Sequence, residues 1–359
     1  MTAIQTHRVR PATIGDVAAI VRVYRSDLPD GTWWRFGAGR RTPAHVEDLT
    51  PFEQWLNGGP WMNPDYLAAH LGRLLREGHL AFVAEDLTPG LDRGSGWAVR
   101  GEIEVFLYRE AGPSGGDPGS LAAHIGVLQV ERGFFRRGIG RALVQRALRE
   151  AARRGARKIT VVSSRDNLAF YRKCGFSLLM PVVTVEGSLP RPNAPETPRL
   201  APPPAGFFAE AVWPSVAGIH PGPGQTWFLY RAHPYADPEF RARRLDVSTL
   251  VLPDRTGRGR RRAIGFFRQN QVDPDEVIFY CLAEPNGDGP DPSFSGLGRA
   301  AFAELLRWSS RLGYRRYRTY LAGCEFSRLR FFFRMTETSR EYILRRFNRD
   351  LEVYPDEQA

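Results

Sequence analysis

Two stretches in the middle of the chain hold residue types and spacings that are suited to chemistry. The first is a basic turn, Arg136 to Gly140, at the start of a helical pattern. Backbone N–H groups without helical partners and the positive end of a helix dipole meet at such a turn, so it suits a phosphate group. The second stretch, Asn167 to Phe176, contains Tyr171, a phenol that is protonated at neutral pH and can donate a proton. Together they predict a phosphate-bearing ligand beside a proton donor.

The elements that position these residues follow from hydrophobic spacing. Ile125 to Val130 is a short apolar run typical of a strand, and Ile159 to Val162 is a second, β-branched one. Gly155 marks the end of the helix between them. The buried face of that helix is predicted by Leu143, Val144, Ala147, Leu148 and Ala151. The basic turn therefore lies where a strand runs into a helix.

Two common phosphate-binding motifs are excluded. No GxxxxGK sequence occurs, so the chain lacks the lysine of a P-loop. The acidic residue that a Rossmann motif needs about twenty positions further on is also missing. What remains is a pyrophosphate held mainly by backbone N–H groups, next to a helix that carries a tyrosine.

The segment VERGFFRRGIGRAL, followed by NLAFYRKCGF, resembles the GNAT superfamily of acyl-CoA-dependent N-acyltransferases. The family's turn pattern is Arg/Gln-x-x-Gly-x-Gly/Ala, and its later signature is an Asn, then Phe/Tyr-Tyr, then Gly-Phe. The resemblance covers roughly Val9 to Val185 and is strongest between His124 and Phe176. It implies transfer of an acyl group, most simply acetyl from acetyl-CoA, to a primary amine by direct attack in a ternary complex.

By this resemblance, the pyrophosphate of acetyl-CoA binds to backbone amides of the turn, and the pantetheine arm binds to the strand before it. Gly138 and Gly140 have no side chain that would hold the phosphates away from the amides. The family's first Arg/Gln falls on Phe135, which can still contribute a backbone contact. For the strand residues core packing is the alternative, and for Asn167 it is helix N-capping. The predicted cofactor-binding residues are Leu128, Gln129, Val130, Phe135, Arg136, Arg137, Gly138, Ile139, Gly140, Arg141 and Asn167.

The same resemblance gives Tyr171 the role of the acid that protonates the departing CoA thiolate; a buried structural tyrosine is the alternative. A base must also take the proton of the attacking amine. His124 falls where some members of the family carry a strand glutamate. Glu102 and Glu104 are rivals, because alternation puts both on one face of the preceding strand. The candidate catalytic residues are therefore Tyr171, His124 and Glu104, with a non-catalytic strand-end histidine as the alternative for His124.

An internal repeat extends the resemblance. GLGRAAFAELLRWSSRLGYRRYRTYLAG from Gly296 aligns without a gap with GIGRALVQRALREAARRGARKITVVSS from Gly138. In the second copy Phe331 and Phe332 stand where a tyrosine is needed, and a phenylalanine cannot donate a proton. The second copy is therefore predicted to be non-catalytic.

The expected fold class is α/β (α+β), with two tandem GNAT-like domains, each a mixed, mostly antiparallel twisted sheet flanked by helices. The domains are expected at residues 1–188 and 206–359, and residues 189–205 read as a proline-rich linker. Helices are also expected over Pro11 to Ser26 and Asn63 to Gly78. Leu28 to Trp61 has little periodicity and is a long excursion of the kind that often faces substrate, with simple packing of its tryptophans Trp33, Trp34, Trp55 and Trp61 as the alternative. The run TWFLYRA is strand-like.

Composition narrows the class of protein. The 359 residues, 42% hydrophobic and 25% charged, are typical of a globular protein with two domains. No run of about eighteen apolar residues occurs and the first residues lack the apolar core of a secretory signal, so a cytoplasmic location is expected. Cys174, Cys281 and Cys324 are far apart and form no CxxC pair, which argues against a disulfide framework or a zinc site.

The net charge of +11 raises the possibility of nucleic-acid binding. The charge is almost entirely arginine spread along the chain, since Lys158 and Lys173 are the only lysines, and this argues against it. Arg255 to Arg262 is the densest cluster and reads as a solvated hairpin loop or, alternatively, a partner-binding patch.

The expected partners are acyl-CoA and a small-molecule or peptide amine, with no membrane and with the chain as a monomer or homodimer. A rival from another class is a non-catalytic acyl-CoA sensor or scaffold. A measured rate of acyl transfer separates the two.

Overall fold

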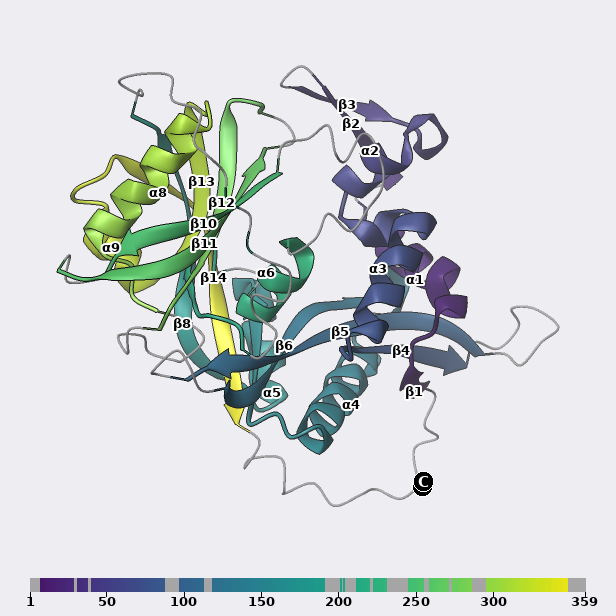
Figure 1. The fold of residues 1–359 in the computed structure, drawn as a ribbon. Coiled ribbons are helices and arrows are strands. Elements are labelled where there is room, and N and C mark those ends of the chain that lie inside the picture. The colour runs from purple at the N-terminus through teal and green to yellow at the C-terminus, as the bar shows by residue number, and fades with distance from the viewer. Residues whose placement is uncertain are drawn as a thin grey trace. The chain divides into compact units, whose positions relative to one another are not determined.

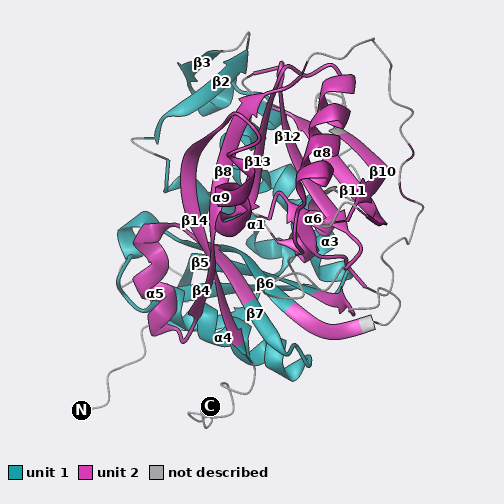
Figure 2. Ribbon diagram, turned by 90° about the vertical axis from the view of Figure 1, so that its left-hand side faces the viewer, with its two compact units in different colours: residues 1–107, 123–159, 347–359 teal, residues 108–122, 160–346 magenta. Residues whose placement is uncertain are grey.

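The computed structural model describes residues 7–28, 31–37, 40–87, 97–112, 118–190, 201, 203, 211–219, 222–230, 245–254, 258–270, 273–285 and 295–347. The chain divides into two compact units, coloured separately in Figure 2. Unit 1 comprises Met1–Leu107, Ala123–Ile159 and Phe347–Ala359; unit 2 comprises Tyr108–Ala122 and Thr160–Arg346. The domain boundaries expected from the sequence stay a prediction, and most of the expected linker lies outside the described residues.

Unit 1 contains a sheet in the order β1-β4-β5-β6, in which β4 is antiparallel to both β1 and β5. The strands are β1 (His7–Pro11), β4 (Leu80–Leu87), β5 (Trp97–Ala111) and β6 (Pro118–Val130). Strand β5 is buried on both faces: Ile103 and Val105 point to one side, and Glu102 and Glu104 to the other. Two glutamates thus occupy positions where a strand covered on both sides normally carries apolar residues.

The helices of unit 1 cover both faces of this sheet. They are α1 (Val17–Arg25), α2 (Pro51–Leu56), α3 (Pro64–Arg76) and α4 (Ile139–Arg153). Figure 1 shows α1 and α3 on one side of β4 and β5, and α4 on the other. All five apolar residues expected to form the buried face of α4 are buried, which confirms that prediction. The α3 prediction is also confirmed, since Asn63 caps the helix by accepting from the Asp65 and Tyr66 N–H groups.

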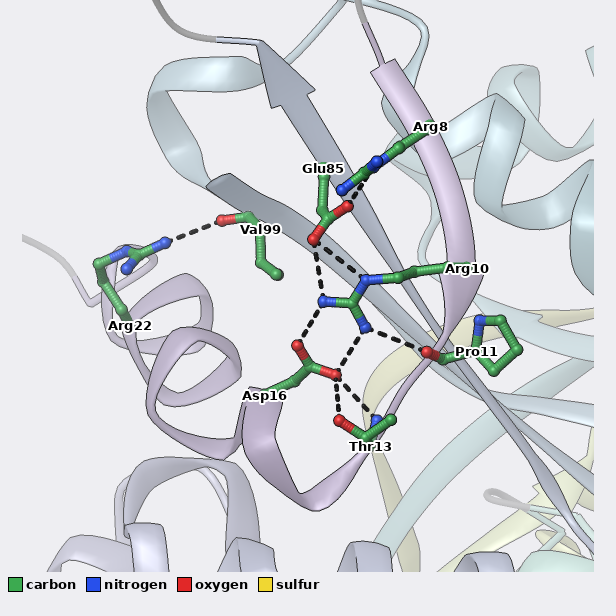
Figure 3. Close-up of polar contacts among 8 residues, drawn as sticks. All are labelled: Arg8, Arg10, Pro11, Thr13, Asp16, Arg22, Glu85 and Val99. Carbon is green, nitrogen blue, oxygen red and sulfur yellow. Dashed lines mark hydrogen bonds and ion pairs between the residues drawn. The ribbon is translucent and has the colours of Figure 1, made fainter. Parts of the chain in front are cut away.

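An ion-pair network fastens the start of α1 to the sheet (Figure 3). The Arg10 guanidinium lies between two carboxylates, 2.6 Å from Asp16 Oδ1 and 2.9 Å from Glu85 Oε1. Arg8 contacts the other oxygen of Glu85 at 2.6 Å. Asp16 also accepts from the Thr13 N–H and hydroxyl, at 2.8 and 2.9 Å. The turn between β1 and α1 is therefore fixed by charged hydrogen bonds as well as by apolar packing.

Unit 2 contains a sheet in the order β14-β8-β13-β12-β11-β10, with β9 paired to β12. Strands β12 and β13 are parallel and are joined by α8, whereas the other pairs on this path are antiparallel. The elements are β7 (Lys158–Ser163, shared with unit 1), α5 (Leu168–Lys173), β8 (Ser177–Ser188), β9 (Ser215–Ala217), α6 (Pro223–Tyr230), β10 (Leu245–Pro253), β11 (Arg260–Gln269), β12 (Glu276–Ala283), α8 (Arg299–Arg311), β13 (Arg316–Ala322), α9 (Gly323–Leu329) and β14 (Met335–Phe347).

Both copies of the repeat have a strand, a helix and a strand in the same chain order: β6-α4-β7 and β12-α8-β13. The glycine that follows each helix has a positive φ, 88° at Gly155 and 93° at Gly313. The glycines before the helices differ, because Gly138 has φ 86°, whereas its counterpart Gly296 has no positive φ and Gly298, the residue before α8, is extended with φ −73°. The repeat thus preserves the helix end but not the turn that precedes the helix.

The segment from Leu28 to Trp61 has little sequence periodicity but contains the hairpin β2 (Trp33–Gly37) and β3 (Arg40–Ala44), followed by α2, whose start is fixed by a capping box between Thr50 and Glu53. One expectation from the sequence is wrong. The run TWFLYRA is not a strand, since most of it lies in α6. A short apolar run is compatible with a buried helix as well as with a strand, and here the helix is adopted.

Candidate active site

The predicted phosphate turn lies in unit 1, between the end of β6 and the start of α4. Phe135 has an extended backbone, Arg136 has φ 63° and Gly138 has φ 86°. When residues with negative φ alternate with residues with positive φ, successive backbone N–H groups point toward one concave side. This is the geometry of an anion-binding nest. The residues from Phe135 to Gly138 are all exposed.

The first turn of α4 supplies further donors. No side chain caps this helix, because the residue at its N-cap is a glycine. The first regular bond of the helix runs from the Ala142 N–H to the Gly138 carbonyl, so the N–H groups of Ile139, Gly140 and Arg141 precede the helical ladder. The positive end of a fifteen-residue helix dipole adds to their attraction for an anion.

Backbone conformation, rather than space, is the reason for a glycine at position 138. A Cβ at this position would lie 3.5 Å from the Cε1 atom of His7, which is an ordinary contact. A φ of 86°, however, is unfavourable for residues with a Cβ. The sequence suggested a different reason, that a side chain at this position would hold the phosphates away from the backbone amides, and this reason stays a prediction.

The strand expected to bind the pantetheine arm forms the end of β6. Leu128, Gln129 and Val130 are half-buried there, and the Gln129 side chain donates to the Val130 carbonyl at 3.3 Å. Gly101 on β5 lies against this strand end, since a Cβ on it would be 3.0 Å from the Gln129 carbonyl oxygen and 3.0 Å from the Ile139 side chain. Sequence reasoning missed this residue, although a glycine inside an apolar strand often marks a close approach of backbones.

Two arginines enclose an aromatic ring next to the turn. The guanidinium of Arg100 lies 4.1 Å from the Phe134 ring centre and that of Arg137 lies 4.7 Å from it. Arg100 is buried and forms an ion pair with Glu131 at 2.8 Å, while Arg137 is exposed and lies 3.8 Å from Asp86. Cation–π contacts with Phe134 therefore hold positive charge at the edge of the turn.

The candidate bases are buried in unit 1. His124 on β6 is 2% exposed. Glu104 on β5 is fully buried and accepts a hydrogen bond from the Trp61 indole N–H at 2.9 Å. His70 Nε2 lies 2.9 and 3.1 Å from the two oxygens of Glu104. Both oxygens of Glu104 are therefore already engaged.

Glu102 lies two residues from Glu104 on the same face of β5. Its Oε2 accepts from the Tyr24 hydroxyl at 2.7 Å, and its Oε1 is buried without a hydrogen-bond partner. Burial raises the pKa of Glu102 well above its usual value, and the charge of Glu104 raises it further. Burial and the two glutamates likewise raise the pKa of Tyr24.

Sequence reasoning missed Tyr24, Trp61 and His70 as neighbours of these carboxyls. A signal existed for His70, which lies among Tyr66, Leu67 and Leu71 on the apolar face of α3. A titratable residue on the buried face of a helix requires a polar partner, and here the partner is Glu104.

Tyr171 and Asn167 lie in unit 2, and their roles beside the turn of unit 1 stay predictions. Tyr171 on α5 is 7% exposed and makes edge contacts with the rings of Phe170 and Phe176. Burial raises its pKa, so the phenol stays protonated at neutral pH. Asn167 is exposed at the N-cap position of α5, but its side chain makes no capping hydrogen bond. The capping alternative for Asn167 is therefore wrong.

Two further findings concern the described part of the chain. No group of three or more His, Cys, Asp or Glu side chains there is arranged to hold a metal ion. None of the helices in these ranges is long and apolar enough to span a membrane. Cys174 and Cys281 are buried free thiols, whereas Cys324 is exposed.

Several solved structures are similar to this chain at low identity. A GCN5-related N-acetyltransferase from Kribbella flavida aligns over 95% of this chain and 71% of its own, with a TM-score of 0.49 and 12% identity. A GNAT family acetyltransferase from Brucella melitensis, in complex with acetyl-CoA, aligns over 48% of this chain and 82% of its own, with a TM-score of 0.29 and 18% identity. The N-acetyltransferase paia from Thermoplasma acidophilum, in complex with coenzyme A, aligns over 48% and 91%, with a TM-score of 0.32 and 17% identity.

No curated protein matches the sequence. The sequence model of the Acetyltransferase (GNAT) family matches residues 98–176. The matched segment begins within β5 and includes β6, the phosphate turn, α4 and α5, which are the elements that carry the predicted site. Residues 98–176 therefore carry the sequence pattern of the GNAT acetyltransferase family.

Proposed function

We propose that this protein is an acetyl-CoA-dependent N-acetyltransferase that acylates a primary amine by direct attack in a ternary complex. The observation that carries the proposal is the turn before α4, in which two left-handed residues and an uncapped helix N-terminus present backbone N–H groups to solvent. This turn lies within the segment that matches the GNAT family.

The pyrophosphate would be held by the backbone N–H groups from Phe135 to Arg141. The exposed guanidiniums of Arg136 and Arg137 would add positive charge, and the end of β6 from Leu128 to Val130 would hydrogen-bond the pantetheine arm as an added strand. Asn167 would contact the cofactor from α5. Acetyl-CoA itself would supply the thioester, whose carbonyl carbon is the electrophile.

The chemistry requires an acid and a base. Tyr171 is proposed as the acid, because its phenol carries a proton at neutral pH and burial, which raises its pKa, keeps it protonated until the thiolate leaves. His124 and Glu104 are the proposed bases for the amine proton. Both oxygens of Glu104 are already engaged by Trp61 and His70. A residue beside Glu104 is therefore favoured over Glu104 itself as the base that takes the amine proton.

The test of the proposal is acetyl-CoA binding to the full chain, measured by isothermal titration calorimetry. Gly138→Glu should weaken binding by at least about 100-fold, because it disturbs several hydrogen bonds to a charged group that contribute about 1.5–3 kcal/mol each. Gly133→Glu is the matched control: it adds the same charge in the same turn, at a position where a Cβ would meet nothing within 4 Å.

Equal affinities of the two variants would remove the turn from the cofactor site. If the wild-type chain binds acetyl-CoA but transfers no acetyl group to any amine tested, the non-catalytic sensor would be the correct function.

A further inference from the structure

Phe331 and Phe332 are consecutive residues in the turn between α9 and β14, and their side chains are 76% and 56% exposed. The other exposed large apolar side chains of the described residues each belong to a different part of the chain: Ile14, Phe135, Leu178 and Val251. A single exposed apolar side chain is ordinary, whereas two neighbouring exposed rings indicate a contact surface. The turn therefore presents a pair of aromatic rings to solvent.

The turn that carries these rings is fixed by its own contacts. The backbone N–H groups of Phe332 and Phe333 both donate to the Leu329 carbonyl, at 2.9 and 3.1 Å. The next ring along the chain, that of Phe333, packs against the core and meets the buried Phe302 ring edge-on at 5.0 Å. The exposed pair is therefore held in place before anything binds, which reduces the entropy lost on binding.

Each exposed ring lies beside a guanidinium. Arg299, the first residue of α8, lies 4.7 Å from the Phe332 ring centre, and Arg330 lies 5.2 Å from the Phe331 ring centre. Arg334, which follows the turn, is exposed like the other two arginines. We call Arg299, Arg330, Phe331, Phe332 and Arg334 the Phe–Arg surface.

The three arginines of this surface have no carboxylate partner within the described ranges. Acidic side chains on α8, α9 and the start of β14 form ion pairs with other arginines: Glu304 with Arg307, Glu325 with Arg328, and Glu337 with Arg340. Hydrogen bonds from Arg340 lower the pKa of Glu337, and the charge of Arg330 adds to this effect. The Phe–Arg surface thus has three positive charges available for a bound anion.

The fold gathers charges that are far apart in the sequence. Arg328 on α9 donates to the Leu297 carbonyl at 2.6 Å, so the end of α9 is tied to the segment that leads into α8. This contact accounts for the approach of Arg299 to the turn after α9. Dispersal of arginine along the chain argued against nucleic-acid binding, but the folded surface places three arginines around two exposed rings.

We propose that the Phe–Arg surface binds single-stranded nucleic acid, with bases stacked on Phe331 and Phe332 and phosphates on the arginines. Proteins that bind single strands combine aromatic rings with positive charge in this way, because every base has a π face. A duplex is disfavoured, since its bases are already stacked on one another. An acidic peptide would satisfy the arginines but would leave the rings without a stacking partner.

The net charge of +11 supports the same choice, because it attracts a polyanion over a long range. Binding through two rings and three arginines should be tolerant of base sequence and sensitive to salt. This inference goes beyond acetyl transfer and does not depend on it.

The test uses the full chain and a fluorescent oligothymidine of about twelve nucleotides, the length of a typical single-strand site. Anisotropy at about 50 mM salt measures its affinity. Wild type should bind the single strand at least about tenfold more tightly than the A·T duplex of the same length. The double variant Phe331→Ala/Phe332→Ala should lose about tenfold or more in affinity for the single strand, because both stacking platforms are removed.

Two matched controls separate this surface from the rest of unit 2. Arg299 and Arg311 are the first and last residues of α8, and both are exposed. Arg299→Gln should weaken binding and reduce the slope of log K against log salt by about 0.7, the value for one phosphate contact. Arg311→Gln should change neither quantity.

Val251→Ala is the control for the rings. Val251 is exposed, and it alternates with Leu250 and Leu252, which share a core cluster with Phe302 of α8. Val251 therefore lies on the face of β10 opposite to α8. This variant should bind the oligothymidine as wild type does, and the double variant should keep the wild-type midpoint of urea unfolding.

The outcomes that overturn the inference are specific. Polyglutamate of the same length that displaces the oligothymidine with equal affinity would assign the surface to an acidic peptide instead. Equal affinity for single strand and duplex, no binding by wild type, or an unchanged affinity in Phe331→Ala/Phe332→Ala would each reject the stacking of bases on the rings. An Arg299→Gln effect no larger than that of Arg311→Gln would reject the phosphate contact.

Discussion

At the scale of single residues, buried polar atoms identify where this protein holds or moves protons. Tyr171 is buried against two aromatic rings, which raises its pKa and keeps it protonated. Glu102 is fully buried, and burial together with the charge of Glu104 raises its pKa well above its usual value. Burial therefore favours the neutral, protonated form of both residues.

Replacing Tyr171 with phenylalanine removes the proposed acid and keeps the ring. We expect kcat for acetyl transfer to fall about 100-fold, the usual contribution of a general acid, while the Kd for acetyl-CoA changes by less than about twofold. Steady-state kinetics by CoA release, together with calorimetry, measure the two quantities. An unaltered kcat with every amine that wild type accepts would show that Tyr171 is structural.

At the scale of elements, the site depends on how closely strands and helices approach one another. Gly101 lets β5 lie against the end of β6 and the start of α4, because any Cβ there would meet three atoms at 3.0 Å. The strand pairing brings β1 beside β4, and the Arg8–Glu85–Arg10–Asp16 network then fixes the turn that leads into α1 (Figure 3). Since α1 carries Tyr24, this network also determines where the hydroxyl that contacts Glu102 lies.

The network makes the stability of the protein depend on pH. Burial by itself raises the pKa of Asp16, but hydrogen bonds from Arg10 and Thr13 outweigh burial and lower it. A carboxyl with a lowered pKa stabilises the fold above its unfolded-state value, about 3.9, and this contribution is lost as the pH falls through the folded-state pKa. Asp16→Asn should therefore cost about 2 kcal/mol at pH 7 and progressively less in acid.

Urea unfolding at pH 7 and at about pH 3 would measure this effect. Asp65→Asn is a suitable control, because Asp65 is exposed in the first turn of α3 and should contribute only about 0.5 kcal/mol. A loss for Asp16→Asn that is the same at both pH values would contradict the role of its charge.

At the scale of the whole molecule, the two copies of the repeat have the same sequence of elements but different turns. Gly138 is left-handed and helps to form the nest, whereas its counterpart Gly296 has no positive φ and Gly298 is extended, so the second copy does not reproduce this backbone geometry before α8. Aromatic residues Phe331 and Phe332 are 76% and 56% exposed in the second copy. That the second copy has no catalytic role stays a prediction.

We therefore expect the chain to bind one molecule of acetyl-CoA. Calorimetry should give a stoichiometry of about one per chain for wild type and for Gly298→Glu, while Gly138→Glu should lose the binding event. A stoichiometry of two, or loss of binding in Gly298→Glu alone, would assign a cofactor site to the second copy.

Local patterns in the sequence determined much of the first copy. Apolar spacing predicted α4 and its buried face, β-branched runs predicted β6 and β7, and the glycines predicted the turn, because each of these depends on neighbours within a few residues. The same patterns did not reveal α2 or β2, although the Thr50–Glu53 capping box of α2 and the pairing of β2 with β3 are local features. The helical state of α6 was also missed, and Trp227 on this helix packs against distant residues such as Tyr108 and Ile264.

Only the tertiary structure brought Tyr24, Trp61 and His70 to the two glutamates of β5. These residues are 78, 43 and 34 positions away from the glutamates that they contact. Alternation along the strand predicted that Glu102 and Glu104 share a face, but it carries no information about which helices cover that face. Which carboxyl oxygen is satisfied and which is left without a donor was decided by the packing of α1, the short helix η4 (Pro60–Met62) and α3, and a linear pattern does not contain it.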